Sequence, residues 1–280
     1  MKKYFFTLDL EEWYHLEYLK EHRDNIVSQL SYINEIMPFM EDMRKEGVRM
    51  TVFVVGDIAN QKSNIIKKIS NMGHEIACHG YSHSLLYELS DEQFRKETKK
   101  AKRTIEKIID RNIEGYRAPC FSMDNSKLNI LWECGFSYDA SLIRFKDHKL
   151  YNVLDMSAFR RVDSLVYENN GRIEFETPTL DVFNHSIPIS GGGYFRIFPL
   201  FLMKLLMKKY LKKEENFVFY IHPFELSPTP LIGVKKIGKK NWIRFQIGRK
   251  KNPKKLKKYI EYLKIINAEF LSFGDYIKNN

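Results

Sequence analysis

Two hydrophobic periods alternate along this chain. Short apolar runs, typical of buried strands, are separated by longer segments in which apolar residues recur with the period of a helix. The short runs predict strands at residues 4–10, 49–55, 74–78, 113–117, 136–140, 172–177, 217–221 and 269–272. The longer segments predict helices at residues 32–46, 58–72, 90–110, 124–134, 199–211 and 253–266. This alternation indicates a mostly parallel α/β sheet, either open or closed into a barrel.

Length and composition favour one domain over residues 1–280. The chain is 44% hydrophobic, and it contains no internal repeat, low-complexity tract or linker. An early Asp9 and the lack of a small-residue cleavage site argue against a signal peptide. Cys78, Cys120 and Cys134 are odd in number and lack CxxC spacing, which suits reduced thiols. We therefore expect a cytoplasmic protein.

A basic segment carries the excess of positive charge. The formal net charge is +11, and residues 226–260 contain twelve Lys or Arg but no Asp or Glu. Such a patch can bind nucleic acid, an anionic membrane or an acidic glycan, although a solvated loop and helix explains it equally well. Only this segment suggests nucleic-acid binding, so we do not expect it. We do expect peripheral contact with the inner face of an anionic membrane, assisted by the amphipathic stretch 200–211.

An acidic cluster ends the first predicted strand. Because strand side chains alternate, Asp9 and Glu11 project to one face, and Glu12 lies just past the strand end. A carboxylate inside such a strand is costly unless it is paired, and a metal ion is a common partner. A solvated acidic turn would explain these residues if they stood alone.

Two histidines follow the third predicted strand. His79 and His83 are spaced so that both imidazoles face one point if the segment makes a helical turn. This spacing also arises by chance on protein surfaces. Together with a strand-end carboxylate, however, the histidines form the two-His, one-carboxylate set of a catalytic zinc or similar metal.

Further polar residues lie at predicted strand ends. Arg117 could hold a carboxylate, His222 could act as a general acid or base, and Asp139 could orient His222. A surface arginine, a core histidine and an Asx turn would explain each of them singly. Together with Asp9 and His79, they come from five separate strand–helix units. Ligands gather at the carboxyl edge of parallel sheets, which predicts one site there.

Seven motifs give the chain a family resemblance. They are, in order, FTLDLEEWYH, TVFVVG, GHEIACHGYSH, GYRAPCFSM, GFSYDAS, GGGYFR and YIHPFEL. Through them the chain resembles the polysaccharide deacetylases of the NodB-homology type, carbohydrate esterase family 4. It is most similar to the branch whose first motif reads Asp-x-Glu-(Asp/Glu)-(Trp/Tyr). The resemblance implies a distorted (β/α) barrel, with seven rather than eight strands, and a divalent metal, usually zinc.

The resemblance also implies the metal ligands. The two histidines, His79 and His83, would bind the metal with one carboxylate. The common motif places that carboxylate directly after the base, where this chain has Leu10. Strand alternation therefore favours Glu11, with Glu12 as the alternative.

Catalytic roles follow from the same resemblance. Asp9 would be the general base, held by Arg117, and His222 would be the general acid, oriented by Asp139. The backbone N–H of Cys120 would bind the oxyanion. Candidates for sugar-stacking walls, which core packing explains equally well, are Trp13, Tyr81, Phe121 and Tyr194.

The implied function is a metal-dependent N-deacetylase acting on an N-acetylated sugar of a glycan or of a lipid-linked glycan precursor. Two alternatives remain open. The same site could hydrolyse another amide, such as a formamido sugar or a cyclic amide, or the chain could be a non-catalytic glycan-binding homologue.

Overall fold

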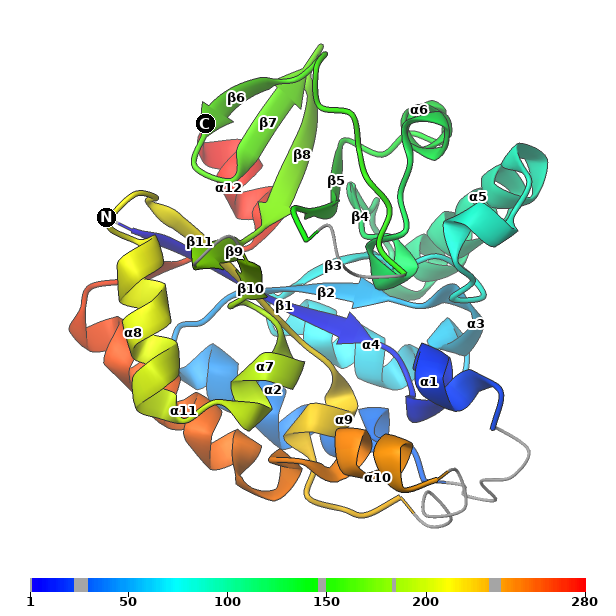
Figure 1. Ribbon diagram of the computed structural model, residues 1–280. Coiled ribbons are helices and arrows are strands. Elements are labelled where there is room, and N and C mark those ends of the chain that lie inside the picture. Colours follow the sequence, from blue (N-terminus) through cyan, green and yellow to red (C-terminus); the bar gives the residue numbers. More distant parts are fainter. Residues whose placement is uncertain (1, 23–29, 146–149, 183–184, 232–237) are drawn as a thin grey trace.

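A parallel sheet forms the centre of the molecule (Figure 1). The computed structural model describes residues 2–22, 30–145, 150–182, 185–231 and 238–280. Seven strands run parallel in the order β11-β1-β2-β3-β4-β5-β8. Their bounds are β1 (Lys3–Leu10), β2 (Met50–Val54), β3 (Glu75–Cys78), β4 (Gly115–Tyr116), β5 (Tyr138–Ile143), β8 (Arg172–Thr177) and β11 (Asn216–Ile221). Each lies where a short apolar run predicted a strand.

The ring of strands stays open on one side. Within the described part of the chain, no hydrogen-bonded ladder joins β8 to β11. Instead, the antiparallel strands β7 (Val166–Asn169) and β6 (Arg160–Asp163) extend the sheet beyond β8. A short strand, β12 (Glu269–Phe270), pairs with β1, and β9 (Thr179–Val182) forms a separate hairpin with β10 (His185–Pro188). The predicted α/β class is therefore confirmed, with seven parallel strands that hydrogen bonds do not close into a full barrel.

Helices pack around this sheet and connect its strands (Figure 1). The longer ones, together with two short ones, are α2 (Met37–Lys45), α3 (Gly56–Ala59), α4 (Ser63–Asn71), α5 (Asp91–Ile109), α6 (Asn125–Glu133), α8 (Leu200–Tyr210), α11 (Asn252–Ile265) and α12 (Phe273–Asn279). The α5 helix begins with a capping box, in which the Gln93 N–H donates to Ser90. The helix predicted at 58–72 is divided into α3 and α4, whereas the helix at 32–46 begins only at Met37.

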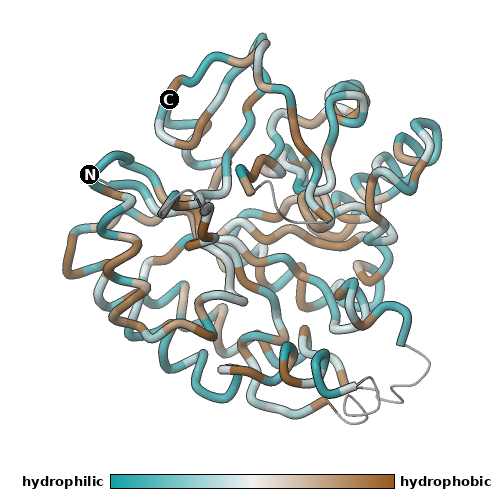
Figure 2. The backbone as a smooth tube through the Cα atoms, viewed as in Figure 1, coloured by the Kyte–Doolittle hydropathy of each residue, from teal (hydrophilic) through white to brown (hydrophobic). Residues whose placement is uncertain are grey.

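Aromatic side chains fill the core on one side of the sheet. Phe175 of β8 stacks on Phe273 of α12 with ring centroids 4.1 Å apart, and Phe5 of β1 packs against both. Figure 2 shows this apolar centre, with hydrophilic residues along the outer helices. Among the described residues, no helix has the length and apolarity needed to cross a membrane.

Candidate active site

A cavity of about 730 Å³ opens at the carboxyl ends of the strands. Asp9 lies at the end of β1, His79 directly follows β3, and His222 directly follows β11. All three side chains line the cavity, together with Glu11 and His83. Because β11, β1, β2 and β3 are consecutive neighbours in the sheet, residues far apart in sequence meet here. The predicted convergence at one edge thus holds for Asp9, His79 and His222.

Glu11, His79 and His83 form a buried cluster with the composition of a metal site. One potential ligand atom from each lies within 4.8 Å of the others. The His79 Nδ1–H donates to the Arg117 carbonyl at 2.8 Å, which leaves the Nε2 lone pair of His79 free. The spacing of the two histidines would suit a helical turn, but the segment after β3 is not helical. His83 instead reaches the cluster through a left-handed backbone, with φ of +56°.

The chemistry of this cluster fits a divalent cation. Oε2 of Glu11 lies 2.5 Å from Nε2 of His83, yet this buried oxygen makes no well-directed hydrogen bond among the described residues. Burial would raise the pKa of Glu11, but the charge and close contact of His83, with the charge of His222, hold it well below its usual range. Burial lowers the pKa of His79 to about 4. A carboxylate and a neutral imidazole are the forms that bind zinc.

Glu12 points away from the two histidines. Its carboxylate accepts hydrogen bonds from the Ser31 hydroxyl and from the Tyr32 N–H at 3.0 Å, and Lys62 lies 3.9 Å away. Between the two candidate ligands, the geometry therefore favours Glu11. The reason is the alternation at the end of β1, which places neighbouring side chains on opposite sides.

Arg117 holds one oxygen of Asp9. Its Nη1 donates to Oδ1 of Asp9 and to Thr7 Oγ1, both at 2.8 Å, and its Nε donates to the Ala140 carbonyl at 3.1 Å. The guanidinium is fully buried over the ring of Phe53. This contact is single rather than bidentate, so Oδ2 of Asp9 remains available to the cavity.

His222 faces both acidic residues of the site. Its Nε2 lies 3.9 Å from Oδ2 of Asp9 and 3.8 Å from Oε1 of Glu11, while its Nδ1 lies 3.1 Å from Oε2 of Glu225. Burial alone would lower the pKa of His222, but the hydrogen bond and charge of Glu225, with the charges of Glu11 and Asp9, raise it to about 9. The imidazole is therefore protonated at neutral pH.

Glu225, rather than Asp139, orients His222. Glu225 belongs to α9 (Pro223–Leu226), and its second oxygen accepts from Arg196 at 2.9 Å. The prediction for Asp139 was wrong because β5 starts at Tyr138 and runs on to Ile143, which places Asp139 near its amino end. The sequence carried a local signal for the partner of His222: a glutamate three residues after the histidine closes a capping box around the first turn of α9.

Asp139 instead belongs to a buried pair of carboxyl groups. Its Oδ1 accepts from the Ser141 hydroxyl at 2.8 Å, and Glu174 is its hydrogen-bonded neighbour. Burial raises the pKa of Asp139 to about 6; burial and the charge of Asp139 raise the pKa of Glu174 well above its usual range. A proton is therefore retained between the two carboxyl groups near neutral pH.

We expect the Asp139→Asn variant to become more stable relative to the wild type as the pH rises from about 4 to about 7. A raised folded-state pKa stabilises the wild type below the unfolded pKa, and this contribution is lost as pH rises through about 6. The variant has no such carboxyl group, so the difference in unfolding free energy should grow by roughly 2 kcal/mol. Urea unfolding at several pH values measures it. A difference that stays constant with pH would refute the shared-proton pair.

Only two of the four predicted aromatic wall residues line the cavity, namely Phe121 and Tyr194. Trp13 is buried in a separate apolar cluster, and its indole N–H donates to the Leu30 carbonyl at 3.1 Å. Tyr81 packs against Gly56 and lies under the Lys100 ammonium, 3.8 Å from its ring centroid. Both were misassigned because an aromatic residue near a motif serves packing as readily as sugar contact.

Two further residues, Cys120 and His15, belong to turns beside the site. Cys120, the predicted oxyanion residue, lines the cavity in the 3₁₀ turn Pro119–Phe121, where its φ is +50°. His15, which the sequence did not single out, accepts the Glu12 N–H at its Nδ1 at 3.1 Å. Its ring centroid lies 5.3 Å from that of His83. His15 therefore braces the turn that carries the acidic residues.

Part of the basic segment is structural. Arg249 is buried and donates to the carbonyls of Phe224, Ser227 and Thr229 at 2.8 to 3.0 Å, which fixes the chain around α9. Lys255 likewise donates to the Phe195 and Phe198 carbonyls. The lysines at 235 and 236 lie outside the described residues.

These features place the molecule among the parallel α/β proteins that carry a metal-type site at the carboxyl edge of the sheet. The sequence model of the polysaccharide deacetylase family matches residues 32–138 of this chain. A second model, for a domain of unknown function (DUF3473), matches residues 141–273. Asp9 and Glu11 precede the first match, and His222 lies in the second.

Known proteins show the same relationship. A peptidoglycan-N-acetylglucosamine deacetylase from Bacillus cereus is 34% identical over 82 residues, which are 29% of this chain and 28% of the relative. The match thus spans less than a third of that relative. The PuuE allantoinase structure superimposes with a TM-score of 0.61 at 15% identity, covering 99% of this chain and 89% of that one. The Bc1974 polysaccharide deacetylase from Bacillus cereus gives 0.52 at 12% identity, with 98% and 92% covered. At these identities the structures establish the fold alone.

Proposed function

We propose that this protein is a metal-dependent N-deacetylase that hydrolyses the acetamido group of an N-acetylated sugar. The observation that carries the proposal is the position of Asp9. One carboxylate oxygen is held by buried Arg117, and the other faces His222 beside the cluster of Glu11, His79 and His83. A base, an acid and a metal-type ligand set thus share one cavity.

The ligand set would hold a divalent cation, for which zinc is the best match. Two imidazoles and one carboxylate are the protein ligands of a catalytic zinc with a coordination position left for water. When bound, the cation would supply Lewis-acid polarisation of the acetyl carbonyl and a more acidic water.

Asp9 would accept the proton of the attacking water. Its Oδ1 is fixed by Arg117, which limits the rotation of the carboxylate. The free Oδ2 is the oxygen that could take the proton as the water oxygen bonds to the carbonyl carbon. The Cys120 N–H, at the cavity wall, would donate to the oxyanion that forms.

His222 would complete the reaction as the general acid. Its Nδ1–H is held by Glu225, so Nε2–H is the proton that faces the cavity. Transfer of this proton to the sugar nitrogen, as the C–N bond breaks, releases acetate and a free amino sugar. Glu225 in turn is fixed by Arg196, which keeps the imidazole in one orientation.

The curated relative acts, by its name, on N-acetylglucosamine in peptidoglycan, and this supports an N-acetylated glycan or a lipid-linked precursor as substrate. Phe121 and Tyr194 would stack against the sugar. We keep the one-domain organisation, the cytoplasmic location and the membrane contact of residues 226–260 as predictions.

We expect the purified, zinc-loaded protein to release acetate from N-acetylated saccharides. A panel that pairs each N-acetylated sugar with its N-formylated counterpart, and adds allantoin, separates the proposed function from the two alternatives. Acetate would support the deacetylase, and formate or allantoin turnover alone would support another amidase. Saccharide binding without any hydrolysis would indicate a non-catalytic homologue.

A further inference from the structure

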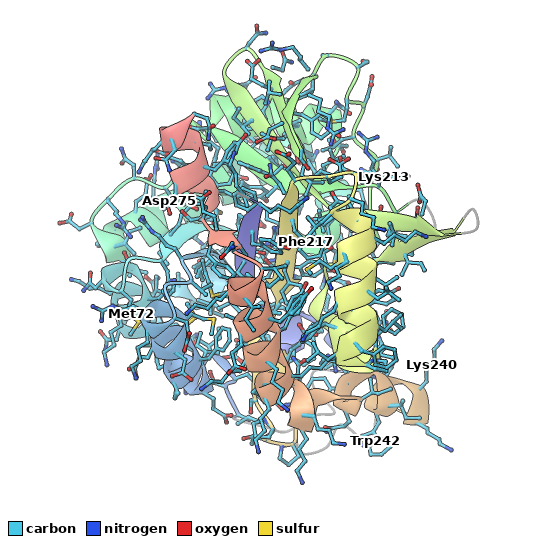
Figure 3. The ribbon with its side chains drawn as sticks, turned by 90° about the vertical axis from the view of Figure 1, so that its left-hand side faces the viewer. Met72, Lys213, Phe217, Lys240, Trp242 and Asp275 are labelled. Atoms are coloured by element: carbon cyan, nitrogen blue, oxygen red, sulfur yellow. The ribbon has the colours of Figure 1, made fainter. Side chains whose placement is uncertain are left out.

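Arg244 presents an exposed guanidinium on the wall of the same cavity. It belongs to α10 (Lys239–Gln246), on the basic segment that the proposed chemistry does not use. Figure 3 shows this helix at the edge of the molecule, with Lys240 and Trp242 labelled. Within the described residues, no carboxylate lies at ion-pair distance from Arg244. Its charge therefore remains available to a ligand.

The other arginine of the cavity is already occupied. Arg196 is paired with Glu225 at 2.9 Å and donates to the carbonyls of Phe245 and Ile247 at 3.2 and 2.9 Å. The cavity wall also carries Glu17, whose carboxylate is paired with the Lys20 ammonium at 3.2 Å. Among the cavity's arginines, only Arg244 combines exposure with an uncommitted charge.

Stacking fixes how Arg244 can bind. Its Cζ lies 4.2 Å from the ring centroid of Tyr18, which also lines the cavity. A guanidinium stacked on a ring covers one face, whereas its N–H donors lie in its own plane and point outward. Such a fork matches the two oxygens of a phosphate or a carboxylate. The tyrosine thereby holds the guanidinium at the cavity wall before any ligand arrives.

The segment that carries Arg244 is basic. Residues 226–260 contain no Asp or Glu, so no acidic residue within this stretch opposes Arg244. Lys240 lies one helical turn before Arg244 and is exposed, but it does not line the cavity. At about 730 Å³, the cavity falls within the ~300–1,000 Å³ typical of small-molecule sites. One ligand can thus contact Arg244 while its acetamido group lies at the reaction centre.

We propose that Arg244 binds an anionic group of the substrate, so that the enzyme prefers N-acetylated sugars that carry a phosphate or a carboxylate. This inference rests on the proposed deacetylase function. It narrows the substrate class from N-acetylated sugars in general to anionic ones. A phosphate would come from a sugar phosphate or a lipid-diphosphate carrier, and a carboxylate from an acidic sugar.

Three substrates and two variants test this inference. The substrates are neutral tri-N-acetylchitotriose, N-acetylglucosamine 1-phosphate and N-acetylmuramic acid. The variants are Arg244→Gln and, as the matched control, Lys240→Gln, which removes a charge from the same helix outside the cavity. We expect R244Q to lower the ratio of kcat/KM for an anionic substrate to that for the neutral one by about 10- to 100-fold, mainly through KM.

The larger loss, on the phosphate or on the carboxylate, identifies the source of the anion. K240Q should leave both ratios within about twofold of the wild type, since rim charges outside a pocket contribute little. Equal losses on all three substrates, or no loss on any, would overturn the anion site.

Calorimetric binding keeps this test separate from the deacetylase proposal. If the wild type releases no acetate from any substrate, the proposed function fails. The anion site would still stand if N-acetylglucosamine 1-phosphate binds the wild type about tenfold or more tightly than R244Q. It would fall if the two proteins bind both this sugar phosphate and N-acetylmuramic acid equally, even with acetate release intact.

Discussion

The Asp9→Asn variant is expected to release acetate about 10³-fold more slowly than the wild type. General-base catalysis contributes roughly 10²–10⁴-fold, and an amide cannot take the proton that Oδ2 would accept. The substitution is close in shape, so Glu11, His79 and His83 should still bind one metal ion. The loss should therefore fall on kcat, with metal content unchanged.

Arg117 makes a stability control necessary for this variant. The arginine is fully buried, and removal of its charged partner leaves an uncompensated charge, a change that typically costs about 3–5 kcal/mol. Glu12→Gln is the matched control, because Glu12 is a buried carboxylate of the same stretch that points away from the histidines. E12Q should keep most of the activity. If D9N folds, binds metal and retains wild-type turnover, Asp9 is not the base.

The His83→Ala variant is expected to lose bound metal and, with it, at least about 10³-fold of the activity. His83 supplies one of only two imidazoles in the cluster, and its Nε2 lies 2.5 Å from the Glu11 carboxylate. Without it, two protein ligands remain, fewer than the three of a catalytic zinc site. Metal content after dialysis, together with acetate release at saturating zinc, measures both effects.

His15→Asn is the matched control for this second variant. Asn can place an acceptor where His15 Nδ1 accepts the Glu12 N–H, so it should preserve the turn and the metal. The two histidine rings are neighbours, and a general disturbance of the region would affect both variants alike. Metal retained by H83A at wild-type affinity would show that the cluster is not the ligand set.

The pattern of apolar runs was sufficient to predict the strands that position the site. Each of the seven parallel strands lies where an apolar run predicted it, and the parallel order brings Asp9, His79 and His222 to one edge. Alternation at the end of β1 also favoured Glu11 over Glu12. Such placements can be inferred from the sequence because the side-chain period of a strand is fixed by its backbone.

The predictions that were wrong or missing concern features that depend on local or three-dimensional detail. Asp139 was misplaced by a few residues of strand boundary, and that shift moved it from the cavity edge into a buried carboxyl pair. The partner of His222 lies on a single helical turn, which has no hydrophobic period to reveal it. Strands β6 and β7 were missed because a hairpin with an exposed face, including Arg160 and Arg161, lacks a continuous apolar run.

Zinc titration of the chelator-treated protein tests the central claim most directly. If Glu11, His79 and His83 hold a catalytic metal, acetate release from an N-acetylated sugar should be lost on chelation. It should then rise in proportion to added zinc and level off at one equivalent per chain. Undiminished acetate release by the metal-free protein would contradict a metal-dependent deacetylase.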